Sequence, residues 1–219
     1  MTGRLARLLA GVLAICVAPG LAQAHPHVLV DAQESLVFDA HGDLTGIAGT
    51  WSFDEAFSAY AVQGYDSKGD GQPTREDLQP LAQTNVESLD RYHFFTRVLV
   101  DGMQVQIGNP TNAWDEFAEE RLVLHFTLPL RRPLRISGHT LSVEVFDPDY
   151  FAAVTFPELQ ATSFASEPKD CQGMIRRPAP LDATAAGRLA QVPVTQRDLP
   201  PDLRAITDRL INAIVLRCH

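Results

Sequence analysis

The sequence predicts a mainly β domain, sandwich-like and antiparallel, with a helix–loop–helix insertion and a C-terminal helix, α+β overall. Several segments alternate apolar and polar residues, as half-buried strands do, and Gly- and Asp-containing turns separate them. An Asp- and Gly-rich loop at 66–77 lies between two segments whose apolar residues have helical spacing. Residues 202–216 are amphipathic at the same spacing, which favours a terminal helix.

The first 24 residues have the organisation of a secretory signal peptide. Arg4 and Arg7 precede an apolar run over 8–18, and Ala22-Gln23-Ala24 is a small-x-small cleavage site. The apolar run is too short to span a bilayer comfortably, and no later stretch is long and apolar enough to do so. We expect residues 1–24 to be removed and 25–219 to form a single β-rich domain in the periplasm.

Pattern and turn chemistry assign each element. Strands are expected at 27–38, 44–53, 92–100, 103–107, 121–128, 141–146 and 152–156. Helices are expected at 55–62, 75–89 and 202–216, so the helix–loop–helix insertion covers about 55–89. The first two strands should form a hairpin, and Asp101-Gly102 predicts a second one. The stretches 109–120 and 166–201 show no clear period and are expected to be irregular.

The predicted chain start carries the main candidate site. Cleavage after Ala24 makes His25 the first residue, and its α-amine and imidazole Nδ1 can chelate one cation. His27 adds another imidazole, and imidazole suits zinc, nickel, cobalt and copper. Pro26 has no N–H, which excludes a square-planar site built on that backbone amide. The alternative is a frayed terminus without metal. His93 would complete a nitrogen-rich site, or it is a structural histidine between aromatic residues.

The loop over 66–77 resembles the twelve-residue calcium loop of EF-hands. Its ligands would be Asp66, Asp70, Gln72 through its carbonyl, Thr74 and Asp77. Lys68 stands where an oxygen donor is usual, and the last carboxylate is one methylene shorter than the usual glutamate, so calcium or magnesium would bind weakly. The alternative is a turn followed by a helix that Thr74 caps, with the carboxylate three residues on.

The cysteines and the charge restrict the possibilities further. Cys16 lies in the signal peptide, so Cys171 and Cys218 remain, and in an oxidising compartment we expect them to form a disulfide. A two-cysteine metal site or a free terminal thiol is the alternative.

A formal net charge of −9 disfavours nucleic acid as a partner. There is no GxSxG, Walker-type loop or HExxH, so we expect no enzyme.

Six features occur in order and together resemble the DUF1007 family of exported bacterial proteins. They are the signal peptide, His25-Pro26-His27-Val28, Trp51 to Ser58, the Asp66–Asp77 loop, Tyr92 to Thr96, and Val145 to Phe151. The resemblance implies a periplasmic component of an uncharacterised ABC-type transport system. It also implies an association with nickel/cobalt-type transporters and zinc-regulated gene sets.

Three hypotheses of function follow. The first is a periplasmic metal-binding accessory that exchanges a divalent transition metal with an inner-membrane transporter, without itself spanning the membrane. The second is a binding or scaffold module that calcium stabilises at Asp66–Asp77. The third is a copper enzyme of the histidine-brace type, using His25 and a remote histidine such as His93.

Overall fold

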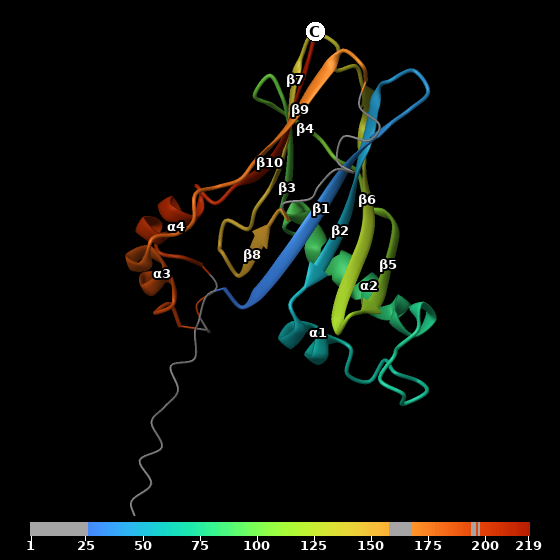
Figure 1. Ribbon diagram of the computed structural model, residues 1–219, viewed down its shortest axis with the longest axis vertical. Coiled ribbons are helices and arrows are strands. Elements are labelled where there is room, and N and C mark those ends of the chain that lie inside the picture. The colour runs from blue at the N-terminus through green and yellow to red at the C-terminus, as the bar shows by residue number, and fades with distance from the viewer. Residues whose placement is uncertain (1–25, 158–167, 194–195, 197) are drawn as a thin grey trace, which may run out of the picture.

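Two five-stranded sheets make up most of the molecule (Figure 1). The computed structural model describes residues 26–157, 168–193, 196 and 198–219. One sheet has the order β5-β6-β2-β1-β8 and the other β4-β3-β7-β10-β9. Every neighbouring pair is antiparallel except β1 with β8. The predicted class, mainly antiparallel β within an α+β fold, is confirmed.

The elements have the following bounds. The strands are β1 (Val28–Phe38), β2 (Leu44–Phe53), β3 (Thr96–Val100), β4 (Met103–Val105), β5 (Thr111–Ala118), β6 (Arg121–Leu134), β7 (Thr140–Val145), β8 (Ala152–Thr155), β9 (Cys171–Arg176) and β10 (Asn212–Cys218). The helices are α1 (Glu55–Ala61), α2 (Arg75–Asp90), α3 (Ala183–Leu189) and α4 (Pro201–Thr207), with a 3-10 turn η1 (His93–Phe95).

The helix–loop–helix insertion and the first hairpin form as the sequence predicts. β1 and β2 pair antiparallel, with Ala32 opposite Trp51. The side chain of Asp54 accepts a hydrogen bond from the backbone N–H of Phe57 (2.9 Å) and so caps α1. α2 buries an apolar face against the core and packs along β5; the buried residues of that face are Leu78, Leu81, Ala82 and Val86.

The predicted terminal helix over 202–216 is wrong in its second half. α4 ends at Thr207, and β10 then pairs with β7 on one side and β9 on the other. Ile214 and Leu216 are fully buried while Arg217 is exposed, which is the alternation of a strand. A short apolar run fits both the helical and the strand period. The open position between β7 and β9 decides in favour of the strand.

Two stretches expected to be irregular contain regular structure, and one expected strand begins late. β5 lies within 109–120, and β9 and α3 lie within 166–201. β5 and β9 are edge strands with largely exposed side chains, so they lack the alternation that marks a half-buried strand. Residues 93–95 have positive φ and form η1 instead of the first part of a strand.

The disulfide ties the end of the chain into the second sheet. Cys171 and Cys218 face each other across β9 and β10 and are bonded, as expected. The C-terminus lies at the opposite end of the molecule from α1 (Figure 1). In the part of the chain that the structure describes, no helix is long and apolar enough to cross a membrane.

Candidate functional site

Backbone hydrogen bonds hold His27 and Val28 in place where β1 begins. The backbone N–H of His27 donates to the carbonyl oxygen of Phe151 (2.8 Å), and that of Val28 donates to the same oxygen (3.2 Å). The imidazole of His27 lies against the ring of Phe151, with ring centroids 4.7 Å apart. His25 falls outside the described residues. The position of His27 is therefore fixed by β8 and the turn before it.

An aromatic cavity of about 530 Å³ lies beside the start of β1. Its size is that of small-molecule sites, and apolar side chains supply most of its lining. Five rings line it: Phe53, Phe57, Tyr92, Phe95 and Phe151. Four of its polar groups are Asn85, Asp147, Asp149 and Asp198. The cavity combines apolar walls with a few convergent polar groups, which makes it the main candidate for a binding site.

Segments that are far apart in sequence meet in this cavity. The end of β2 and the start of α1 bring Phe53 and Phe57 together, with ring centroids 4.9 Å apart. The turn after α2 contributes Tyr92 and Phe95, whose rings stack at 5.4 Å. The turn between β7 and β8 contributes Phe151. Three of the motifs that carry the family resemblance thus supply the rings, and Val28 of a fourth motif is also in the wall.

The carboxyl group of Asp147 organises the turn that forms one side of the cavity. It is buried and accepts backbone hydrogen bonds from Asp149 and Ala152, each 2.9 Å long. Burial raises the pKa of Asp147, and the nearby charge of Asp149 raises it further, against the effect of the backbone hydrogen bonds. Arg204 of α4 forms an ion pair with Asp149 (2.5 Å). The turn is thus braced from within and from α4.

A second buried acid lies behind the cavity wall. The side-chain amide of Asn85 lines the cavity and donates to Asp115 Oδ2 (3.2 Å). Asp115 is fully buried between β5 and α2, and this desolvation raises the pKa of its carboxyl to about 7. The sequence did not single out Asp115, because its segment was expected to be a loop. The signal that could have identified Asp115 is a polar residue on the side of a strand that faces a helix.

The structure does not place His93 in the cavity lining. Its backbone has φ of 50°, and the residue is exposed at the start of η1. Its neighbours Tyr92 and Phe95 supply the rings that line the cavity. In residues 26–157, 168–193, 196 and 198–219, no group of three or more His, Cys, Asp or Glu side chains could hold a metal ion. The described residues alone therefore do not supply a metal site around His27, and the predicted ligand His25 lies outside them.

The calcium-type loop is closed by hydrogen bonds of its own. Asp66 accepts from the backbone N–H groups of Gly69 (2.8 Å) and Gly71 (2.7 Å), which lower the pKa of its carboxyl. Gly71 has φ of 77°, so it makes the sharp turn predicted at the sixth position. Another predicted oxygen donor is engaged in the same loop, since Asp70 accepts from the backbone N–H of Gln72 (3.0 Å).

The last two ligand positions of the loop form a helix cap. Thr74 and Asp77 make a reciprocal capping box at the start of α2. Hydrogen bonds from Ser67 and Thr74 lower the pKa of Asp77 to about 2. The helix that Thr74 caps is therefore present, with the Asp77 carboxylate three residues on. The carboxylate that would be the bidentate calcium ligand is engaged with Thr74 through backbone and side chain (2.9 and 2.7 Å).

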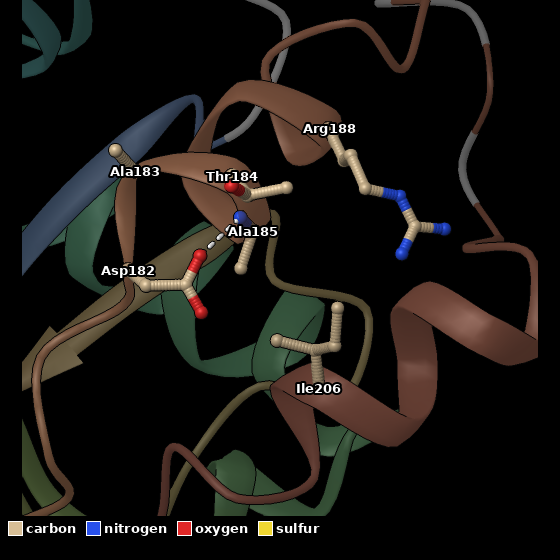
Figure 2. Close-up of a pocket in the computed structure, with 6 residues that line it drawn as sticks. All are labelled: Asp182, Ala183, Thr184, Ala185, Arg188 and Ile206. Carbon is tan, nitrogen blue, oxygen red and sulfur yellow. Dashed lines mark hydrogen bonds between the residues drawn. The ribbon is translucent and has the colours of Figure 1, made fainter.

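A second, shallow hollow of about 350 Å³ lies between α3 and α4 (Figure 2). The carboxylate of Asp182 caps α3 by accepting from the N–H of Ala185 (2.8 Å), as the dashed line in Figure 2 shows. Arg188 forms an ion pair with Asp202, and Ile206 lines the α4 side. Asp182 and Arg188 thus each already have a partner, so the hollow offers little to a ligand.

The outer face of the first sheet carries a histidine network that the sequence did not reveal. Its centre is the half-buried His125 of β6. Its ring stacks on Trp114 at 3.8 Å, and the guanidinium of Arg75 covers Trp114 at 4.1 Å. Its two ring nitrogens lie 3.3 Å from Thr50 Oγ1 and 3.0 Å from Glu116 Oε1. These partners come from β2 and β5, so only strand pairing brings them together.

Comparison with known proteins gives two findings. The sequence profile of a family described as "Protein of unknown function (DUF1007)" matches residues 10–218. An uncharacterized protein of Haemophilus influenzae is 28% identical over 158 residues, which cover 71% of this chain and 74% of that protein.

Proposed function

Because the chain belongs to the DUF1007 family, we propose that it is a periplasmic metal-binding accessory of a divalent transition-metal transport system. It would exchange zinc, nickel, cobalt or a similar ion with an inner-membrane transporter. The observation that supports this proposal best is the anchoring of His27 on Phe151, because a fixed chain start brings potential ligands to one place.

The ligand chemistry follows from the residues at this start. After removal of residues 1–24, the α-amine and imidazole of His25 would supply two nitrogens, and the imidazole of His27 a third. Such borderline nitrogen donors select zinc, nickel, cobalt and copper over magnesium and calcium. His27 lies against Phe151 in the turn that also carries Asp147, and a bound cation nearby would favour the ionised form of that carboxyl.

Metal binding of the correctly processed protein tests the proposal. Zinc and nickel affinities would be measured by titration calorimetry, with the processed terminus verified by mass spectrometry. We expect the double variant His25→Ala, His27→Ala to lose at least about 100-fold in affinity, as removal of two of the ligand residues implies. His41→Ala, an exposed histidine in the first hairpin turn, is the matched control. Equal affinities of wild type and double variant would overturn the proposal.

A second function is a binding or scaffold module that calcium stabilises. The observation that favours it is the wrapping of the loop around Asp66, which accepts two loop N–H groups and leaves the turn at Gly71 in the shape a calcium loop requires. Calcium should then raise Tm, and Asp66→Ala should remove that gain. Zinc or nickel should leave Tm unchanged. An unchanged Tm in calcium would exclude this function.

A further inference from the structure

We infer that the aromatic cavity binds a small organic cation with an apolar body, such as an amine or quaternary ammonium carried on a ring or alkyl group. The inference concerns the cavity walls and does not depend on the proposed metal site. It is built on the lining of the cavity, on the charge around it and on the exposure of its rim.

The walls are suited to an apolar, positively charged guest. Aromatic rings present a negative face that attracts cations, and two ring pairs, Phe53 with Phe57 and Tyr92 with Phe95, line the space. The guanidinium of Arg91, which does not line the cavity, lies 5.7 Å from the ring of Tyr92, so one of these rings already makes a cation–π contact.

The rim is open to solvent in a way unusual for large apolar side chains. Phe151 is 48% exposed and Tyr92 44% exposed, whereas Phe53 is 8% exposed. Exposed large apolar side chains that cluster at a concave surface mark a binding site more often than scattered ones do. A guest that covered the two rim rings would remove this apolar surface from water.

The charge around the cavity is negative. The described residues that line it include three aspartates, Asp147, Asp149 and Asp198, and no Lys or Arg. Arg204 neutralises Asp149 through its ion pair, which leaves the exposed Asp198, and Asp147 when it is ionised, to attract a guest. Asp147 is buried, and burial raises the pKa of its carboxyl. A cation in the cavity would favour the ionised form of Asp147, whereas an anion would face repulsion.

Charge-matched probes test the inference. Benzyltrimethylammonium, benzyl alcohol and benzoate share a ring but carry positive, zero and negative charge. None of the three needs a metal, and the quaternary ammonium has no lone pair to bind one, so failure of the metal proposal leaves this test intact. Titration calorimetry in the presence of a chelator should give an affinity for benzyltrimethylammonium at least about fivefold above that for benzyl alcohol, from cation–π attraction and charge together. Benzoate should show no saturation.

Two variants separate the contributions. Phe151→Leu keeps an apolar side chain but removes the ring, and should lower the affinity for the cation about fivefold or more. Asp198→Asn, at an exposed position, should lower the affinity for the cation at low salt and leave the affinity for benzyl alcohol unchanged. Tyr60→Leu, an exposed tyrosine of α1 that does not line the cavity, is the control. Equal binding of cation and alcohol, preference for benzoate, no binding of the cation, or an unchanged cation affinity in Phe151→Leu would each overturn the inference.

Discussion

The replacement Glu34→Gln should remove the part of the fall in stability between pH 5 and pH 7 that the buried carboxyl of Glu34 causes. Glu34 lies on the buried face of β1 with no exposed surface, and its Oε1 accepts a hydrogen bond from Trp51 Nε1 (2.7 Å). Desolvation raises the pKa of this carboxyl from 4.5 to about 8, against the smaller opposite effect of the Trp51 hydrogen bond. The folded protein therefore holds the proton to higher pH than the unfolded chain.

The sign and the size of the effect follow from this difference. Below pH 4.5 both states are protonated and the group contributes nothing; above that pH the unfolded chain ionises first, so stability falls as pH rises towards 8. Between pH 5 and pH 7 the loss from this one group amounts to about 2 to 3 kcal/mol. The introduced glutamine would be uncharged in both states, and its amide oxygen can still accept from Trp51, so the variant should lack this loss.

Urea unfolding at pH 5, 6 and 7, followed by the fluorescence of the buried Trp51, measures the difference directly. The wild-type free energy of unfolding should fall relative to that of Glu34→Gln by about 2 to 3 kcal/mol over the range. Other buried acids contribute equally to both proteins and cancel. Glu120→Gln, in the exposed turn between β5 and β6, is the control and should follow the wild type. Parallel curves for wild type and Glu34→Gln would show that Glu34 does not carry the proton.

Three further predictions concern stability. Asp115→Asn should raise the free energy of unfolding by about 4 kcal/mol at pH 8 and have little effect at pH 4, because burial raises the pKa of Asp115 from 3.8 to about 7; unfolding at both pH values measures this, and an equal effect at both would contradict it. Replacing Cys171 and Cys218 by Ser should lower the free energy of unfolding by about 4 kcal/mol, because the disulfide closes a loop with a sequence separation of 47. Urea unfolding measures this loss, and a loss below about 1 kcal/mol would contradict the prediction. Thr74→Ala should lower Tm, with a loss of about 1 kcal/mol from the capping box, whereas Thr84→Ala on the exposed face of α2 should have little effect; equal shifts in the two variants would argue against the cap.

The parts of the fold that local patterns control were predicted correctly. The capping residues Asp54 and Thr74 begin α1 and α2 where the sequence places them. The alternation before and after the turn at Gly42 predicts the β1–β2 hairpin. These features depend on residues within a few positions of one another, so their signals survive without tertiary information.

Features that depend on distant neighbours were missed or misassigned. β5 and β9 are strands because β6 and β10 offer a free edge, although their own side chains are mostly exposed. Residues 212–216 follow the strand period because they fill the position between β7 and β9, where a helix has no place. In both cases, pairing overrides the weak local preference.

For the candidate site, the sequence supplied the ligand types but not their arrangement. It drew attention to His27 and to the motifs that contain Phe53 and Asp147, but gave neither of these two residues a role in a site, and it made His93 a possible metal ligand. In the structure, His93 is exposed beside the cavity lining, while Phe53 and Asp147 belong to it.

By itself the sequence determined the β-rich class, the helix–loop–helix insertion, the capped loop at Asp66–Asp77 and the pairing of Cys171 with Cys218, because each follows from local chemistry or from simple counting. Only the tertiary structure decided that Val28, Phe53, Tyr92 and Phe151 share one cavity. Their segments lie on different strands and turns, and a chain reveals which of its distant side chains meet only when the sheets that carry them have paired and packed.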